Sequence, residues 1–231
     1  MPQAGDPGRG PQVREMFDRI APTYDLANRV LSMGIDTIWR RHAIRSLGNL
    51  GPCLDLCAGT LDLTLELLDA GATSVTAVDF SPEMLEHGKK RLPEGAPVTV
   101  VEGDAQALPV DGPFSAAICG FGLRNVPDNA AALGEVYRVL SPGAHFAVLE
   151  FFKPVRADAR AFHTVFNNVV LPNVGGLISG DRAAYSYLAD SMVTYLTRED
   201  FDALALEVGF EVLSSAELIP PVASLVVLRK P

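Results

Sequence analysis

The pattern of hydrophobic and polar positions divides the chain into an amino-terminal helical part, an alternating part and a helical insertion. Residues 13–48 carry apolar side chains at helical spacing, namely Val13, Met16, Phe17, Ile20, Leu26, Val30, Leu31, Ile38 and Trp39. Pro22 and Gly34 interrupt this pattern, so it predicts two or three helices. From residue 52 onward, short apolar runs alternate with longer amphipathic stretches.

The alternating part predicts a parallel sheet that is covered by helices. Strands are expected at residues 52–57, 74–79, 97–102, 114–120 and 145–151, and helices at 61–70, 82–91 and 129–140. The strand segments are almost continuously apolar, which is typical of strands with helices on both faces. Alternating strands and helices favour right-handed crossovers and therefore a doubly wound α/β fold.

Residues 153–196 break this alternation and predict a mostly helical insertion. Thr197 and Asp200 form a capping box at the start of the next helix, which Gly209 ends. FEVLSSAEL and ASLVVLRK add two last strands and complete a seven-stranded, mostly parallel sheet. We expect residues 13–231 to form a single domain with a lid at 13–48, and residues 1–12, rich in Pro and Gly, to be disordered.

Composition narrows the function classes. The chain has 231 residues and a net charge of -9, which argues against nucleic-acid binding. No apolar run reaches the ~18 residues that span a bilayer, and no secretory signal is visible, so we expect a cytoplasmic protein. The three cysteines are expected to be free and buried. The four histidines lack ligand spacing, so no metal site is expected.

Four strand ends carry side chains that are suited to ligand binding, and ligands of doubly wound sheets bind at such ends. They are Asp55 with Cys57-Ala58-Gly59-Thr60, Asp79 with the helix cap Ser81-Pro82, Asp104-Ala105, and GFGLRN at 120–125. One aspartate at a strand end is as readily a turn residue or a helix cap. Three at successive strand ends favour a nucleotide site.

The type of nucleotide follows from what the loop lacks. Asp79 lies 20 residues after Gly59, the spacing of a carboxylate that binds ribose hydroxyls. The dinucleotide pattern GxGxxG and the phosphate-loop pattern GxxxxGK[ST] are absent. S-adenosylmethionine (SAM) has no phosphates, and its carboxylate can meet the positive end of a helix. The sequence therefore favours SAM, with Asp79 on the ribose and Asp104 on the adenine.

Leu61 stands where a nucleotide loop would have a small residue. A left-handed backbone at a leucine costs about 1–2 kcal/mol. A place in the first turn of the following helix would cost nothing, and we expect this second arrangement.

The chain resembles the UbiE/MenG C-methyltransferases, which methylate the ring of prenylated quinols in ubiquinone and menaquinone synthesis. The resemblance covers nearly everything after residue 13, and its specific stretches are FDRIAPTYDLANRVLSMGIDTIW, LDLCAGTLDLTLELL, GDAQALP, FGLRNVPD, RVLSPGAHFAVLEFFKP and YSYLADSM. It implies a class I, Rossmann-like methyltransferase fold with SAM as cofactor. It also implies that Arg124 and Asn125 face the substrate. The expected cofactor contacts are Asp55, Cys57, Ala58, Gly59, Thr60, Asp79, Phe80, Met84, Asp104, Ala105 and Gly120.

Four departures distinguish the chain from the family pattern. The family usually reads GGTGD where residues 58–62 read AGTLD, and His where Asp36 stands. It usually reads Lys-Pro-Gly-Gly at residues 141–144, which are SPGA here, and Ser at Phe152. These changes bear on the identity of the substrate and, at the loop, on cofactor affinity.

The expected chemistry is transfer of a methyl group to an electron-rich ring carbon of a quinol. Arg124 stays protonated, so we expect it to stabilise a phenolate or order a water, whereas a surface salt bridge is its plain alternative. Asn125 would orient the substrate, and Tyr24 and Asp25 of the lid are further partners. His163 is either a base or a histidine on a helix surface.

The most specific function that we expect is conversion of demethylmenaquinol to menaquinol, with a ubiquinone precursor as a related substrate. The alternatives are a methyltransferase for a smaller phenol or natural product, and a silent SAM-fold scaffold in a quinone-synthesis complex. Peripheral contact with the inner face of the membrane and a homodimer stay open. Net negative charge argues against anionic lipid as the main means of access.

The insertion supplies a row of apolar residues at helical spacing: Phe162, Val165, Phe166, Val169, Val170 and Leu171. We expect this row and the amino-terminal helices to form a lid over an apolar channel for the prenyl tail. The alternative is ordinary core against the sheet.

Overall fold

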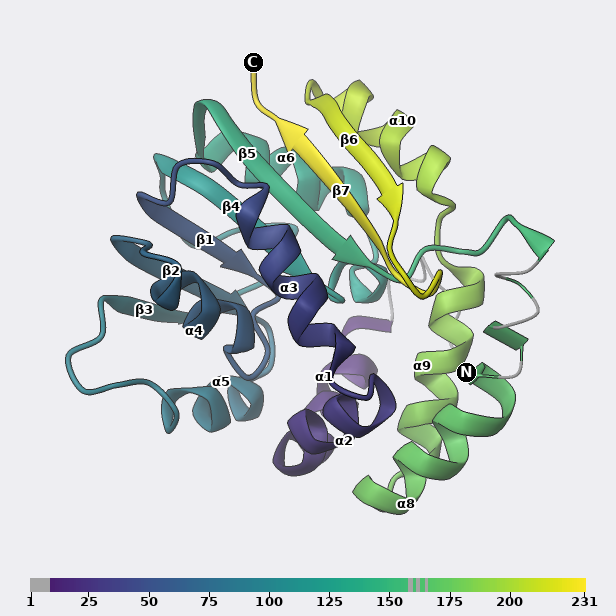
Figure 1. Cartoon of the computed structure of the whole chain (residues 1–231). Helices are drawn as coiled ribbons and strands as arrows, with labels where there is room; N and C mark the ends of the chain where they lie inside the picture. The colour runs from purple at the N-terminus through teal and green to yellow at the C-terminus, as the bar shows by residue number, and fades with distance from the viewer. Residues whose placement is uncertain (1–8, 158–159, 161–162, 165) are drawn as a thin grey trace.

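The computed structural model describes residues 9–231 except for 158–159, 161–162 and 165. Within these residues, seven strands form one sheet in the order β3-β2-β1-β4-β5-β7-β6 (Figure 1). The strands are β1 (Pro52–Leu56), β2 (Ser74–Asp79), β3 (Val98–Glu102), β4 (Phe114–Gly120), β5 (Leu140–Glu150), β6 (Glu211–Glu217) and β7 (Ser224–Arg229). The strands from β3 to β5 pair in parallel, and β7 runs antiparallel to both of its neighbours. The predicted mostly parallel, doubly wound sheet is therefore confirmed.

Helices cover both faces of the sheet, and each face has its own apolar cluster. Ala117 and Cys119 of β4 face the cluster beneath α6 (Asn129–Val139) and α10 (Arg198–Val208). Ala116 and Ile118 face the cluster beneath α3 (Ile35–Arg45) and α4 (Asp62–Asp69). This alternation follows from the two-residue period of a strand. It explains why the strands read as continuous apolar runs.

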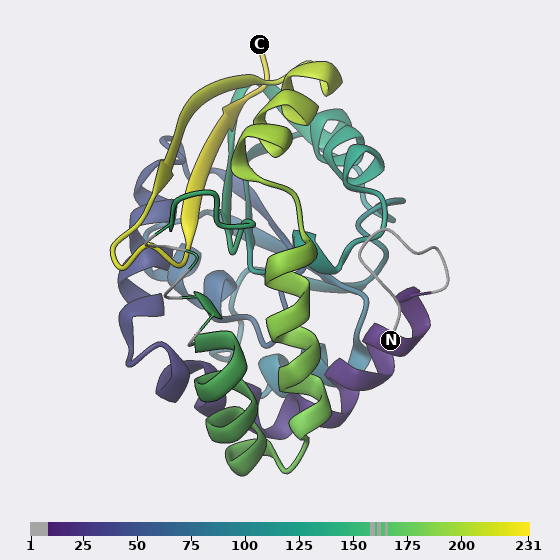
Figure 2. The same cartoon turned by 90° about the vertical axis from the view of Figure 1, so that its right-hand side faces the viewer.

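The amino-terminal helices and the insertion pack together at the carboxyl ends of the parallel strands (Figures 1 and 2). They comprise α1 (Arg9–Ile20), a short 3₁₀ turn (Ala21–Thr23), α2 (Tyr24–Leu31), η3 (Phe166–Gly175), α8 (Gly176–Ser179) and α9 (Arg182–Thr194). α5 (Pro82–Lys89) packs against α1. None of the described helices is long and apolar enough to cross a membrane.

Two expectations about these helices need correction. α1 begins at Arg9, so residues 9–12 are helical and were wrongly expected to be disordered. Pro11 fits there because first-turn N–H groups have no helical partner. η3 is a π-helix with Pro172 inside it, so the 3.6-residue spacing does not apply. Leu171 is buried and Val169 is exposed, while Phe162 and Val165 lie outside the described residues.

Candidate cofactor site and active site

A cavity of about 680 Å³ lies at the carboxyl ends of β1, β2, β3 and β4, between the strand-end loops and helices α1 and α2. Ten of the predicted site residues line it: Tyr24, Cys57, Gly59, Asp79, Phe80, Met84, Asp104, Ala105, Gly120 and Asn125. Four others, Asp55, Ala58, Thr60 and Arg124, are not among the lining residues. The cavity therefore brings together side chains from four strand ends and the lid.

Some cavity residues were not foreseen from the sequence. Phe17 of α1 and Phe121 after β4 supply apolar wall, and Arg14 forms an ion pair of 2.6 Å with Glu102 at the end of β3. Phe17 was recognised only as a member of a helical apolar pattern. Glu102 ends its strand just as Asp79 does, so its position was the signal that could have identified it.

Asp79 holds the loop after β1 in place. Its carboxylate accepts hydrogen bonds from the backbone N–H of Gly59 at 2.8 Å and of Ser81 at 2.9 Å. Burial raises the pKa of Asp79 to about 6. Each carboxylate oxygen has a second lone pair, so ribose hydroxyls can still bind there. Asp79 thus shapes the glycine turn and offers the acceptor that a nucleoside needs.

Leu61 is a correction to the expected loop. Its backbone is left-handed, with φ 65° and ψ 25°, and it forms the N-cap of α4 rather than the first turn of that helix. The Leu61 side chain is fully buried beside Leu85 of α5. Room for it exists because residue 88 is glycine, where an added Cβ would lie 2.4 Å from the Leu61 Cγ. Burial of the leucine therefore compensates for a strained backbone.

We expect Leu61→Gly to destabilise the protein, although glycine suits this backbone. Relief of the left-handed strain is worth about 1–2 kcal/mol. Loss of a buried leucine side chain costs roughly 2–5 kcal/mol and leaves a cavity. Urea unfolding should show a net loss, and calorimetric SAM affinity should stay within a few-fold, because the loop already has the glycine conformation. A stabilised variant would contradict this account of Leu61.

Asp55 lies beneath the cavity instead of lining it. The side chain is completely buried at the end of β1, where it accepts a hydrogen bond of 2.6 Å from the Thr64 hydroxyl of α4. Its other oxygen has no hydrogen-bond partner among the described residues. Burial raises the pKa of Asp55 to about 7. Asp55 therefore anchors α4 to β1 and so holds the two ends of the loop between them together.

The raised pKa of Asp55 predicts a distinctive pH dependence of stability. The folded state holds the proton more tightly than the unfolded state, whose pKa is near 3.8, so stability falls as pH rises from that value toward 7. The expected slope is about 1 kcal/mol per pH unit for this group. Asp55→Asn should remove that slope in urea unfolding between pH 5 and pH 8. Identical slopes for the two proteins would show that Asp55 does not titrate there.

Asp104 and Cys57 both line the cavity. Asp104 is exposed, and its carboxylate accepts hydrogen bonds from the Gln106 backbone N–H at 2.9 Å and from the Gln106 side-chain amide at 3.0 and 3.1 Å. Its remaining lone pairs could accept a hydrogen bond from an adenine amino group. Cys57 follows β1 with φ 55°, and Phe121 follows β4 with φ 59°. Left-handed non-glycine residues of this kind cluster at functional sites. Both lie where β1 and β4 meet, the switch point of the sheet.

Arg124 lies behind the cavity wall. Its Nη1 pairs with the Glu150 carboxylate at 2.7 Å, its Nε donates to the Ser191 hydroxyl at 3.2 Å, and both charged side chains are almost fully buried. Burial alone would lower the pKa of Arg124, but neighbouring Glu150 outweighs it and raises that pKa. The alternative of a surface salt bridge is therefore wrong. Glu150 was missed because its partner lies 26 residues away in the sequence.

Tyr24 and Asn125 line the cavity in front of the buried Arg124 side chain. Burial raises the pKa of the Tyr24 phenol, and the Arg124 guanidinium opposes the shift. The Asn125 side-chain oxygen accepts a hydrogen bond of 3.2 Å from Tyr187 of α9. One wall of the cavity thus combines a phenol, an amide and a nearby cation. Such a wall can bind and orient a hydroxyl group, and the Arg124 guanidinium favours negative charge on it against the effect of burial.

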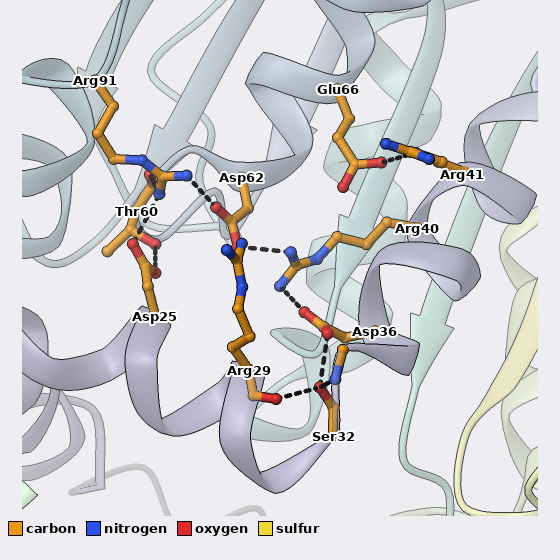
Figure 3. A network of polar contacts seen from close by, with 11 residues as sticks. Asp25, Arg29, Ser32, Asp36, Arg40, Arg41, Thr60, Asp62, Glu66 and Arg91 are labelled. Carbon is orange, nitrogen blue, oxygen red and sulfur yellow. Dashed lines mark hydrogen bonds and ion pairs between the residues drawn. The ribbon is translucent and has the colours of Figure 1, made fainter. Parts of the chain in front are cut away.

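Thr60 and Asp25 belong to an ionic network that joins the lid to the loop (Figure 3). The Thr60 hydroxyl donates to Asp25 of α2, and Arg91 pairs with Asp25 at 2.8 Å and with Asp62 at 2.5 Å. Arg40 of α3 continues the network with ion pairs to Asp62 at 2.6 Å and to Asp36 at 3.1 Å. Asp25 and Thr60 therefore join α2 to the loop after β1. Asp36, a departure from the family pattern, has Arg40 as its partner.

His163 lies away from the cavity. The side chain is buried, and burial lowers its pKa below the usual value. It makes a hydrogen bond with the backbone of Val222, just before β7. The interpretation as a helix-surface histidine is wrong, since the side chain is 2 % exposed.

Comparisons with known proteins agree with this architecture. The cyclase SpnF, described as a [4+2]-cyclase, matches with a TM-score of 0.73 and 16 % identity, covering 100 % of this chain and 98 % of that one. A possible histamine N-methyltransferase from Thermotoga maritima, described as SAM-dependent, matches with a TM-score of 0.68 and 18 % identity over 95 % of this chain and 100 % of that one. At this identity the matches establish the fold alone, which is that of class I SAM-dependent methyltransferases.

Sequence relatives identify the family. Residues 7–226 match the model of the ubiE/COQ5 methyltransferase family. A ubiquinone/menaquinone biosynthesis C-methyltransferase UbiE from Geotalea uraniireducens is 37 % identical over 96 % of this chain and 97 % of its own length. A demethylmenaquinone methyltransferase from Thermus thermophilus is 43 % identical over 85 % of this chain and 92 % of its own. The protein is a SAM-dependent methyltransferase by fold and family. It belongs to the ubiE/COQ5 methyltransferase family.

Proposed function

We propose that this protein transfers a methyl group from SAM to a ring carbon of a prenylated quinol, with demethylmenaquinol as substrate and menaquinol as product. The similarity to a ubiquinone/menaquinone biosynthesis C-methyltransferase supports methyl transfer to carbon. The 43 % identical demethylmenaquinone methyltransferase from Thermus thermophilus supports demethylmenaquinol as the substrate. The observation that carries the proposal is the position of Arg124. The buried, permanently protonated Arg124 guanidinium lies behind Tyr24 and Asn125. These two residues line the same cavity as Asp79, the carboxylate proposed to bind the ribose.

The cofactor fits the residues that are present. When bound, SAM would supply a methyl group on a positively charged sulfur, and the sulfur would leave as a neutral thioether when the methyl group is transferred. Asp79 offers its remaining lone pairs to the ribose hydroxyls, and Asp104 lies at the adenine end. The loop from Cys57 to Gly59 leads to the N-terminal end of α4, which favours a carboxylate. Met84 and Phe80 supply the apolar wall against the nucleoside.

The residues on the substrate side of the cavity bind and orient the quinol ring. Tyr24 and Asn125 bind a ring hydroxyl and orient the ring, while Arg124 favours the negative charge that develops on that hydroxyl oxygen as the ring carbon takes up the methyl group. Alignment of the ring carbon with the methyl group contributes several kcal/mol, on the order of what oriented intramolecular reactions gain. Helices α1 and α2 contribute Phe17 and Tyr24 to the lining of this cavity.

No described residue of the insertion lines the cavity, so the prenyl tail is not placed by the row of apolar residues around Leu171. Leu171 is packed in the cluster that joins η3, α9 and the amino-terminal helices.

One assay distinguishes quinol methylation from methylation of a smaller phenol and from a SAM-binding scaffold without activity. The purified chain is mixed with SAM and either a short-chain demethylmenaquinol or a simple phenol without a prenyl tail, and methyl transfer is followed with radiolabelled SAM. Transfer to the quinol supports the proposal. Transfer to the simple phenol alone supports the smaller-substrate alternative, and SAM binding without transfer supports the scaffold.

A further inference from the structure

Helix α2 is apolar on two opposite faces. Tyr24, Ala27 and Leu31 point into the protein, where Tyr24 lines the cavity and Ala27 is fully buried. Leu26 and Val30 lie on the other face and are 59 % and 45 % exposed. Met33, in the turn that follows, is 82 % exposed. A short surface helix normally has one polar face, so this second apolar face needs an explanation.

A second apolar element lies beside the first. α8 packs against α2, and its Leu177 is 86 % exposed. Both helices lie at the same end of the molecule, opposite the carboxyl terminus (Figure 1), and α8 remains at that end in the rotated view (Figure 2). Residues 166–180 contain no charged side chain. We name the four exposed residues Leu26, Val30, Met33 and Leu177 the apolar cap.

The charge around the apolar cap differs from that of the whole chain. Residues 24–45 contain four arginines and two aspartates, although the chain as a whole carries -9. Both aspartates, Asp25 and Asp36, are bound by arginines inside the network of Figure 3. Arg29, Arg41 and Arg45 are exposed, and of these Arg41 forms an ion pair of 3.9 Å with Glu66 of α4. The outer side of α2 and α3 is therefore locally basic.

We propose that the apolar cap docks on an anionic lipid bilayer, with exposed leucine and methionine side chains in the acyl region and the arginines at the headgroups. Shallow insertion of this kind is typical of amphipathic surface helices with a basic border. The proposal rests on the proposed function, since a prenylated quinol resides in such a bilayer. Docking through α2 would place the inner face of the same helix, with Tyr24 on the cavity, next to the source of substrate.

A bilayer fits this surface better than a second copy of the chain. A two-fold interface would bring the same patch against itself, so two patches of like, positive charge would be brought together. An anionic bilayer offers both an apolar interior and negative charge. The occupant is therefore inferred from charge as well as from exposure.

Vesicle sedimentation tests the docking directly with the full chain. Vesicles of phosphatidylcholine with phosphatidylglycerol should bind the wild type, and vesicles of phosphatidylcholine alone should bind it less. The double variant Met33→Asp/Leu177→Asp should lower the bound fraction by about tenfold or more, because two charges enter the acyl region. Leu206→Asp is the matched control, since Leu206 is 58 % exposed on the distant helix α10. The control should bind as the wild type does.

Activity provides a second measurement. The double variant should lose methyl transfer to a long-tailed quinol in vesicles and keep transfer to a short-tailed quinol in solution. A wild type that does not sediment with anionic vesicles overturns the docking, whatever its activity. A wild-type dimer that the double variant dissociates also overturns it in favour of a second copy. A wild type that sediments but methylates neither quinol would contradict the proposed function and leave the docking supported.

Discussion

Arg124→Lys is expected to lower kcat by about 10²-fold or more and leave SAM affinity within a few-fold. Lysine keeps the charge but loses the planar fork that binds Glu150 and Ser191 at once. The cation would then no longer be fixed behind Tyr24 and Asn125. Since stabilisation of a phenolate is needed only in the transition state, the loss should fall on kcat.

The choice of lysine instead of alanine matters for this experiment. Removal of the Arg124 side chain would leave Glu150 buried without a partner, which costs roughly 3–5 kcal/mol and would confuse stability with catalysis. Arg138→Lys is a suitable control, since Arg138 pairs with Glu135 on the exposed side of α6. Equal losses of SAM affinity and turnover in Arg124→Lys would mean that Arg124 supports the cofactor loop instead.

Asp79→Asn should weaken SAM binding by about 10²-fold or more. In the wild type, one carboxylate oxygen of Asp79 accepts the Gly59 N–H and the other accepts the Ser81 N–H. An asparagine has one oxygen and one NH₂ group, so one of these two N–H groups loses its acceptor. The ribose hydroxyls lose an acceptor at the same place. Titration calorimetry measures this loss. Asp111→Asn, at a fully solvated carboxylate, provides the control.

The pH dependence of binding adds an internal check on Asp79. Burial raises the pKa of Asp79 to about 6 in the cofactor-free protein, so wild-type SAM affinity should decline as pH falls below that value. The same decline should be absent in Asp79→Asn. Wild-type affinity that does not change between pH 5 and pH 8 would show that another group binds the ribose.

The sheet could be predicted because its signal is local. β2 and β4 have the predicted bounds, since both are short, continuously apolar segments between turn residues. The strand-end aspartates could be predicted for the same reason. Asp79, which was predicted from its spacing to Gly59, and Asp104, which was predicted from its place after a strand, both line the cavity.

The remaining features depend on contacts between distant residues. The left-handed backbone of Leu61 is possible because Gly88 leaves room for the leucine side chain, and nothing near Leu61 in the sequence indicates this. Arg124 is buried because Glu150, at the end of another strand, neutralises it. Asp55 has the same residue type as Asp79 but points toward Thr64 of α4. Spacing alone cannot distinguish a ligand-facing carboxylate from one beneath the site.

Net charge shows the same limit. The value of -9 argued against attraction to anionic lipid, yet the segment from Tyr24 to Arg45 carries more arginines than aspartates. Charge acts through its distribution over the surface, and distribution requires a fold. The expected binding to anionic vesicles therefore follows from where the arginines lie on the surface, which the net charge does not reveal.

The central claim is transfer of the methyl group to a ring carbon of a prenylated quinol. Incubation of the full chain with demethylmenaquinol and SAM carrying a ¹³C-labelled methyl group, followed by NMR of the extracted product, tests it most directly. The account predicts a new methyl signal attached to ring carbon, at a rate that Arg124→Lys lowers. A methyl signal on oxygen, or an unchanged quinol in the presence of bound SAM, would contradict it.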